Sequence, residues 1–342
     1  MTAAPLVERA RRPATRTRQP RARRKPSRSL ALSRLRRSLA RQWWIALLAA
    51  SVVVAAGVIY DALGGVRPLA SALFWLPFGL TAGLTLALVR EIGRNTITSV
   101  SSLGKHRNYA VVGAAPELTA KALRQLPPDR RTAIGCLAFQ PASSFSTAFR
   151  DLQHALANSS VVSFVAALPA EGATTAAVCA AVSATQQGRK TIVVDCDTRR
   201  RTLSRYLESE AEVGTLEASQ RPAGWQSFVH EEPETGLHYL PAARGPNPWR
   251  TLADSPGFPA LIDELRTAYD LVVLDCPPAL GSADGPIVAS MADQCVVVAS
   301  WDRTPISALR NAMRLLQRAE ITTGVYVNRV PPEYRFGRLR GD

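Results

Sequence analysis

The sequence has little cysteine, and its cysteines form no recognisable pattern. No two of them make a CxxC pair, and none stands near a histidine at a metal-ligand spacing. This argues against a disulfide framework and against a structural zinc site. Because most lie in apolar runs, we expect buried thiols in a reducing compartment; the five are Cys136, Cys179, Cys196, Cys276 and Cys295.

Acidic residues are nearly absent from the N-terminal part of the chain. Residues 1–41 hold fourteen Lys or Arg and one acid, Glu8, whereas the rest of the 342 residues holds 28 bases and 26 acids. The arm therefore carries +13 of the net charge of +15, which argues against a uniformly basic nucleic-acid-binding fold. The arm also lacks interleaved aromatic residues for base stacking. We expect a disordered arm that contacts anionic lipid, with the option of a helix near Leu30–Arg41.

Charges are missing from two apolar runs, Trp43–Tyr60 and Pro68–Val89. Each is long enough to cross a hydrocarbon core of about 30 Å, so we predict two transmembrane helices within residues 42–90 rather than two core helices. Bases precede the first run and follow the second, while only Arg67 lies between them. The positive-inside rule then places both termini in the cytoplasm and the loop Asp61–Arg67 outside.

Beyond a linker region over residues 91–143, apolar runs alternate with helical stretches. This predicts an α/β domain over residues 144–330, with a parallel sheet covered by helices on both faces, followed by a tail over 331–342. The expected strands are Val161–Leu168, Thr191–Cys196, Leu237–Leu240, Leu271–Cys276, Gln294–Ser300 and Gly324–Asn328, with a further strand at Thr132–Phe139. The expected helices are Ser144–Ala157, Thr174–Gln187, Pro259–Thr267 and Pro305–Ala319.

The turn after the first of these strands has the position and composition of a phosphate-binding loop. It reads Pro169-Ala170-Glu171-Gly172-Ala173-Thr174-Thr175. Small residues let backbone N–H groups surround a phosphate, and the following helix contributes a partial positive charge. A working loop also needs a lysine for the β- and γ-phosphates, but Ala173 stands in its place. By itself the segment also fits a simple strand–turn–helix with a threonine cap.

Acids follow the next two buried strands. Asp195 and Asp197 project on the same side at the end of one strand, where they suit a metal ion beside a phosphate. Asp275 ends a fully apolar run, and a buried carboxylate is costly unless a charge compensates it. Ligands in parallel sheets bind at the carboxyl ends of the strands, so these turns mark the candidate site.

Together these motifs resemble the cytoplasmic domain of bacterial tyrosine kinases (BY-kinases), the autokinases associated with polysaccharide co-polymerases in capsule and exopolysaccharide synthesis. The motifs are P-A-E-G-A-T-T, V-V-D-C-D-T-R-R, L-H-Y-L-P-A-A followed by P-N-P, and Y-D-L-V-V-L-D-C-P-P. The resemblance covers about residues 144–330. It implies an α/β P-loop fold of the MinD/ParA-like group, ATP and Mg²⁺ as cofactors, a bacterial inner (plasma) membrane location, and polysaccharide polymerase or export machinery as partners.

The resemblance also implies roles for individual residues. The catalytic acids would be Asp195, Asp197 and Asp275, and the metal ligands would be Thr174, Asp195 and Asp275. The cofactor-binding residues would be Ala170, Glu171, Gly172, Ala173, Thr174, Thr175 and Asn328, the last near the nucleotide base.

Departures from the family pattern decide between three functions. The loop lysine is missing, the assembly helix keeps only Arg150 of its E-x-x-R-x-x-R pattern, and the tyrosine-rich tail is reduced to Tyr334. We therefore predict a regulatory or scaffolding pseudokinase that binds ATP weakly. The alternatives are an active autokinase whose cation is Arg199 or Arg200, and a MinD/ParA-like positioning ATPase. The sequence does not specify the oligomeric state.

Overall fold

The computed structural model describes residues 28–64, 68–92, 95–100, 103, 109–243, 251–332 and 334. The chain divides into two compact units, Met1–Ala87 and Leu88–Asp342. The start of the predicted arm, the P-N-P motif at 246–248 and most of the predicted tail lie outside the described residues.

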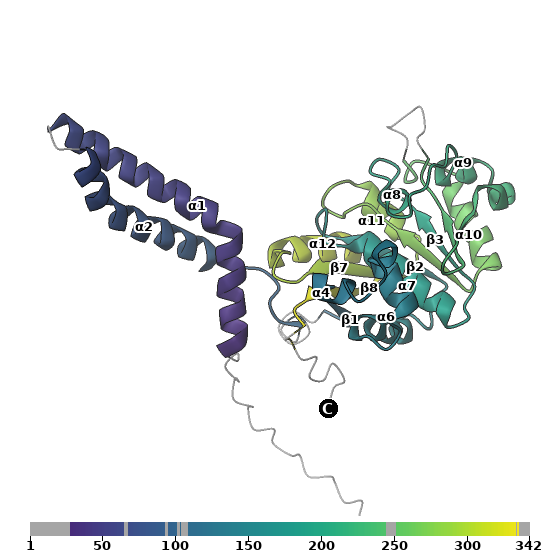
Figure 1. Ribbon diagram of the computed structural model, residues 1–342. Coiled ribbons are helices and arrows are strands. Elements are labelled where there is room, and N and C mark those ends of the chain that lie inside the picture. The colour runs from purple at the N-terminus through teal and green to yellow at the C-terminus, as the bar shows by residue number, and fades with distance from the viewer. Residues whose placement is uncertain are drawn as a thin grey trace, which may run out of the picture. The chain divides into compact units, whose positions relative to one another are not determined.

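The first unit contains the helix α1 (Arg28–Leu63) and most of α2 (Pro68–Ile92), which lie side by side (Figure 1). Small residues allow their close approach. A Cβ atom on Gly57 would lie 2.3 Å from the Trp75 ring, and one on Gly79 would lie 2.7 Å from the Ala50 carbonyl oxygen. Asp61 accepts a hydrogen bond from the Trp75 indole at 2.9 Å. Because α1 begins at Arg28, the end of the predicted disordered arm is helical.

The apolar runs predicted to cross a membrane fall within these two helices. Among the residues whose placement the structure describes, no helix is both long enough and apolar enough to span one. The predicted transmembrane hairpin therefore finds no support in the structure.

The second unit is built on an eight-stranded sheet with the order β1-β8-β7-β2-β6-β3-β5-β4. Strand β4 pairs antiparallel with β5, and the other pairings between the described strands are parallel. The strands are β1 (Val111–Pro116), β2 (Val161–Ala166), β3 (Thr191–Asp195), β4 (His230–Glu232), β5 (Leu237–Leu240), β6 (Leu271–Asp275), β7 (Gln294–Ser300) and β8 (Thr322–Val330).

Helices cover both faces of this sheet, as the sequence predicts. In β2, Val161 and Val165 pack into the cluster that includes α10, α11 and α12, while Val162 and Phe164 pack into the cluster under α5, α6 and α7. All five cysteines are buried and free, as expected. The helices are α4 (Ala120–Leu123), α5 (Ala133–Phe139), α6 (Ser144–Ala155), α7 (Ala173–Gln186), α8 (Thr202–Tyr206), α9 (Thr215–Gln220), α10 (Phe258–Ala268), α11 (Asp284–Ala289) and α12 (Ile306–Arg318).

Two parts of the predicted linker belong to the folded domain. The strand predicted at Thr132–Phe139 is wrong: this segment forms α5, and the Thr132 hydroxyl caps it by accepting the Gly135 N–H at 3.0 Å. Strand β1 pairs with β8 at the edge of the sheet. Gly113 makes that pairing close, because a Cβ atom there would lie 2.8 Å from the Tyr326 ring. The sheet domain thus begins well before residue 144.

Candidate functional site

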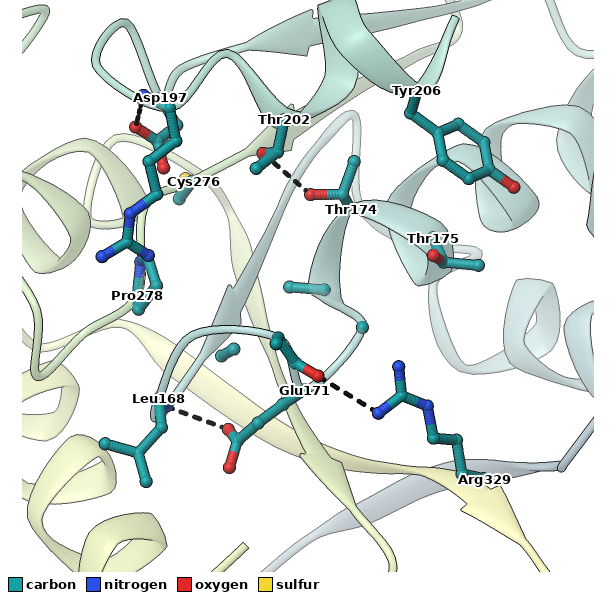
Figure 2. A pocket seen from close by; sticks show the side chains of 15 residues that line it. Leu168, Glu171, Thr174, Thr175, Asp197, Thr202, Tyr206, Cys276, Pro278 and Arg329 are labelled. Atoms are coloured by element: carbon teal, nitrogen blue, oxygen red, sulfur yellow. Dashed lines mark hydrogen bonds between the residues drawn. The ribbon is translucent and has the colours of Figure 1, made fainter. Parts of the chain in front are cut away.

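The three predicted motifs follow β2, β3 and β6. They meet at the carboxyl ends of these strands, which lie side by side in the sheet. Asp195 and Asp275 are register partners on β3 and β6, so both acids stand at the same level. A cavity of about 270 Å³ lies beside the loop that joins β2 to α7 (Figure 2). The residues that line it are Ala166, Leu168, Ala170, Glu171, Gly172, Ala173, Thr174, Thr175, Asp197, Arg200, Thr202, Tyr206, Cys276, Pro278 and Arg329.

The loop between β2 and α7 has a left-handed backbone at two positions. Gly172 has a φ of 97°, which residues with a Cβ atom rarely adopt, and a Cβ atom there would lie 2.2 Å from the Asn328 side-chain nitrogen. Ala170 has a φ of 64° without being glycine, which costs about 1–2 kcal/mol. The loop thus keeps a left-handed backbone at Ala170, although a residue with a Cβ atom disfavours it. Ala173 is then the first residue of α7.

Glu171 links this loop by hydrogen bonds to the segment that follows β7. Its carboxylate accepts the Leu168 N–H at 3.0 Å and the Thr304 hydroxyl at 2.5 Å (the first bond is drawn in Figure 2). Thr304 in turn accepts the Ser300 N–H at the end of β7. Burial raises the pKa of Glu171, while these hydrogen bonds oppose the rise. The side chain therefore shapes the loop, although the residue also lines the cavity.

A chain of hydroxyl groups connects α7 to the acid at the end of β6. The Thr174 hydroxyl hydrogen-bonds to the Thr202 hydroxyl at 3.0 Å, and Thr202 lies 3.4 Å from the Asp275 Oδ2 atom (Figure 2 shows the first contact). The other Asp275 oxygen, Oδ1, is buried without a hydrogen-bond partner in the described part of the chain. Burial, followed by the nearby Asp195 charge, raises the pKa of Asp275 well above its ordinary value. A cation at this position would relieve both costs.

The two acids of the second motif are placed differently. Asp195 is fully buried, and its oxygens accept the Ser204 N–H and hydroxyl and the Asp197 N–H. It therefore organises the turn and is absent from the cavity lining. Asp197 does line the cavity, and it accepts the Arg200 N–H at 2.9 Å. The structure thus brings Asp197 to the cavity and keeps Asp195 behind it.

Some of the remaining predicted residues line the cavity, and others lie outside its lining. Thr175 and Ala173 line the cavity beside the start of α7. Asn328 instead packs under the loop, where its side chain donates to the Glu171 carbonyl at 3.3 Å. No cluster of three or more His, Cys, Asp or Glu side chains suited to a metal ion occurs among the residues that the structure describes. Of the predicted metal ligands, Thr174 lines the cavity, whereas Asp195 and Asp275 are buried at the strand ends and are absent from its lining.

Among the cavity residues that sequence reasoning missed, Thr202 and Arg329 bring polar groups to the site. Thr202 begins α8 just after the second acidic motif. A hydroxyl residue at that place in the sequence could have been proposed as a site residue. Arg329 comes from β8, and its guanidinium donates to the Ala170 carbonyl at 3.1 Å (Figure 2). Of the two arginines considered from the sequence, Arg200 lines the cavity, whereas Arg199 pairs with Asp284 at 3.6 Å.

The buried acids predict how stability changes with pH. Burial raises the pKa of Asp195 to about 6, from an ordinary 3.8, so the folded state holds its proton more tightly than the unfolded state. This contribution to stability is present below the ordinary pKa and is lost as the pH rises through about 6. We expect urea denaturation without ligand to give a lower free energy of unfolding at about pH 7.5 than at about pH 5. A higher value at about pH 7.5 would contradict this placement of the acids.

The loop, the helix start and the acids at the strand ends define a P-loop-like α/β domain, and known proteins agree. A family model described as ATPase MipZ matches residues 161–300. EpsB of Ralstonia solanacearum, named as a putative tyrosine-protein kinase, is 28% identical over 283 residues, which cover 80% of this chain and 37% of EpsB. The succinoglycan biosynthesis transport protein ExoP of Rhizobium meliloti is 28% identical over 182 residues, 51% of this chain and 23% of ExoP.

A solved structure shows the same fold. The kinase domain of Escherichia coli tyrosine kinase ETK superposes with a TM-score of 0.62 at 20% identity, covering 72% of this chain and all of that domain. These findings confirm the resemblance of the chain to bacterial tyrosine kinases. The chain spans little more than a third of EpsB and less than a quarter of ExoP.

Proposed function

We propose that this protein is a regulatory or scaffolding pseudokinase of exopolysaccharide or capsule synthesis or export, which binds a nucleotide but turns it over weakly or not at all. One observation carries the proposal. The phosphate-type loop and Thr174 line the cavity and Asp275 is buried at the end of β6, but the first residue of α7 is Ala173 where such a loop needs lysine. Losing a comparable electrostatic contact typically lowers a rate by roughly 10²-fold or more.

The residues present fit a nucleotide with Mg²⁺. The N–H groups at the start of α7 would hold phosphate oxygens, since a helix N-terminus favours anions. Thr174 and the unpartnered Asp275 oxygen would hold Mg²⁺, which would supply positive charge next to the phosphates. The positive charge of the lysine is missing. The remaining groups can therefore bind a phosphate, but they stabilise it less well while it is being transferred.

Two alternatives stay open to test. An active autokinase is favoured by Arg200, which lies in the cavity wall and offers a cation. A positioning ATPase is favoured by the match to the MipZ model, but the missing lysine weighs against it. Partners in polysaccharide polymerisation or export are inferred from the relatives' names.

Nucleotide binding by the purified full chain tests the property that these functions share. We expect ATP to raise the melting temperature, and to do so more with Mg²⁺ than without it. Absence of any binding at roughly millimolar ATP, the upper range of typical KM values, would exclude both the nucleotide-dependent scaffold and the active kinase.

The proposal also includes attachment to the inner membrane through the first unit, with both termini on the cytoplasmic side. Its support is the run of large apolar side chains left exposed on the two helices, among them Leu48, Ile59 and Leu63 on α1 and Leu73 and Phe74 on α2. Such patches on a folded unit mark interaction with membranes or proteins. We expect the chain in membrane fractions after alkaline carbonate washing. Recovery in the supernatant would contradict an integral anchor, and recovery there before washing would contradict attachment altogether.

A further inference from the structure

The cavity has a cation that reaches the phosphate-type loop from outside it. Arg329 lies near the end of β8, where its backbone takes a left-handed φ of 58°. Its guanidinium donates to the Ala170 carbonyl at 3.1 Å and lines the cavity beside Gly172 and Ala173 (Figure 2). The charge thus stands against the same loop whose own lysine position carries none.

Glu117 and Glu171 attract this charge, but its hydrogen-bonding capacity is largely unused among the described residues. A guanidinium has five N–H donors, and the bond to Ala170 is the one that the described residues give it. The neighbouring Glu171 carboxylate is already engaged by Leu168 and Thr304. Partial burial, and then repulsion from Arg303, lower the pKa of Arg329. A partly desolvated and incompletely paired guanidinium favours the approach of an anion.

The other arginines near the site are less well placed for this task. Arg199 is paired with Asp284 and lines a smaller neighbouring cavity. Arg200 lines both cavities, and its guanidinium reaches the region of Gly281, where a Cβ atom would lie 3.6 Å from it. Among these side chains, Arg329 is the one bonded to the loop itself.

We propose that Arg329 replaces the missing loop lysine as the phosphate-binding cation, so that the site takes the phosphates of a nucleoside di- or triphosphate. The planar guanidinium suits two phosphate oxygens at once, whereas a lysine acts as a point charge. This inference rests on the proposed nucleotide binding and adds its recognition residue.

The test measures the affinity of the full chain for ATP in a set of variants. Arg329→Ala removes the charge and the bond to Ala170, while Arg329→Gln removes the charge and keeps a donor. Arg303→Ala is the matched control, since Arg303 is a neighbouring, exposed arginine outside the cavity lining. We expect both Arg329 variants to lose roughly 10-fold or more in affinity, in line with hydrogen bonds to charged groups, and the control to change less than about 2-fold.

A double variant, Arg329→Ala with Ala173→Lys, is compared with Ala173→Lys alone. If Arg329 takes the place of the lysine, the two cations bind the same phosphates in the double variant. The loss of ATP affinity caused by Arg329→Ala then shrinks to less than about 3-fold in the Ala173→Lys background. An equal loss in both backgrounds would overturn the proposal, because Arg329 would then only hold the loop. So would Arg329 variants that bind like the control while the wild type binds ATP. No binding by the wild type would overturn this proposal together with the proposed function.

Discussion

Replacing Ala173 with lysine is expected to raise the affinity for ATP by roughly 10- to 100-fold, the range for hydrogen bonds to charged groups. Ala173 is the first residue of α7, follows the left-handed Gly172, and lines the cavity. The loop backbone already has the required shape, so the substitution adds a charge without remodelling the fold. Isothermal titration of the full chain with ATP and Mg²⁺ measures the effect.

A matched control adds the same charge at the other end of the same helix. Gln187 is the exposed C-cap residue of α7, so Gln187→Lys leaves the cavity untouched. We expect its affinity to stay within about 2-fold of the wild type, because exposed charges at that distance are screened. If Ala173→Lys gave no more than this control, the missing lysine would not be what limits the site.

Replacing Asp275 with asparagine is expected to stabilise the ligand-free protein. Asp275 is buried, one of its oxygens has no partner among the described residues, and burial raises its pKa well above the ordinary value. Asparagine removes the charge at nearly constant volume and can still accept from Thr202. We expect the free energy of unfolding at neutral pH to rise by roughly 1–3 kcal/mol, because each unit by which burial raises a carboxyl pKa costs about 1.4 kcal/mol once the group ionises. The same variant should lose the extra stabilisation that Mg²⁺ gives with ATP.

Asp195→Asn is expected to have the opposite effect on stability to Asp275→Asn, because the Asp195 carboxylate has hydrogen-bond donors on both oxygens. Both Asp195 oxygens accept N–H or O–H donors from Ser204 and Asp197. An amide nitrogen in place of either oxygen would face a donor, so we expect this variant to unfold more easily than the wild type. Urea denaturation measures both variants. Destabilisation by Asp275→Asn would show that this carboxylate supports the fold rather than being held for a cation.

The sequence patterns predicted the sheet domain better than the site within it. The apolar run Leu271–Leu274 was predicted as part of a buried parallel strand, and β6 is found there. Thr132–Phe139 is equally apolar, but local capping by Thr132 made it a helix. Short apolar runs do not distinguish these outcomes by periodicity.

The site was harder to predict because it depends on contacts between distant segments. Asp195 and Asp197 are two residues apart and predicted as a pair, but Asp197 lies beyond the strand, where the backbone turns and separates them. Arg329 reaches the loop because β8 lies two places from β2 in the sheet order and because its backbone is left-handed. Neither the strand order nor that φ value is encoded in a local pattern.

The most direct test of the account is turnover by the wild-type full chain with labelled ATP and Mg²⁺, run on the same preparation that shows ATP binding. We predict that ATP raises the melting temperature while hydrolysis and phosphotyrosine stay at the level of a blank without protein. Phosphotyrosine that accumulates with time in the wild type, and is lost when Asp197 is changed to asparagine, would contradict the pseudokinase and establish an active kinase.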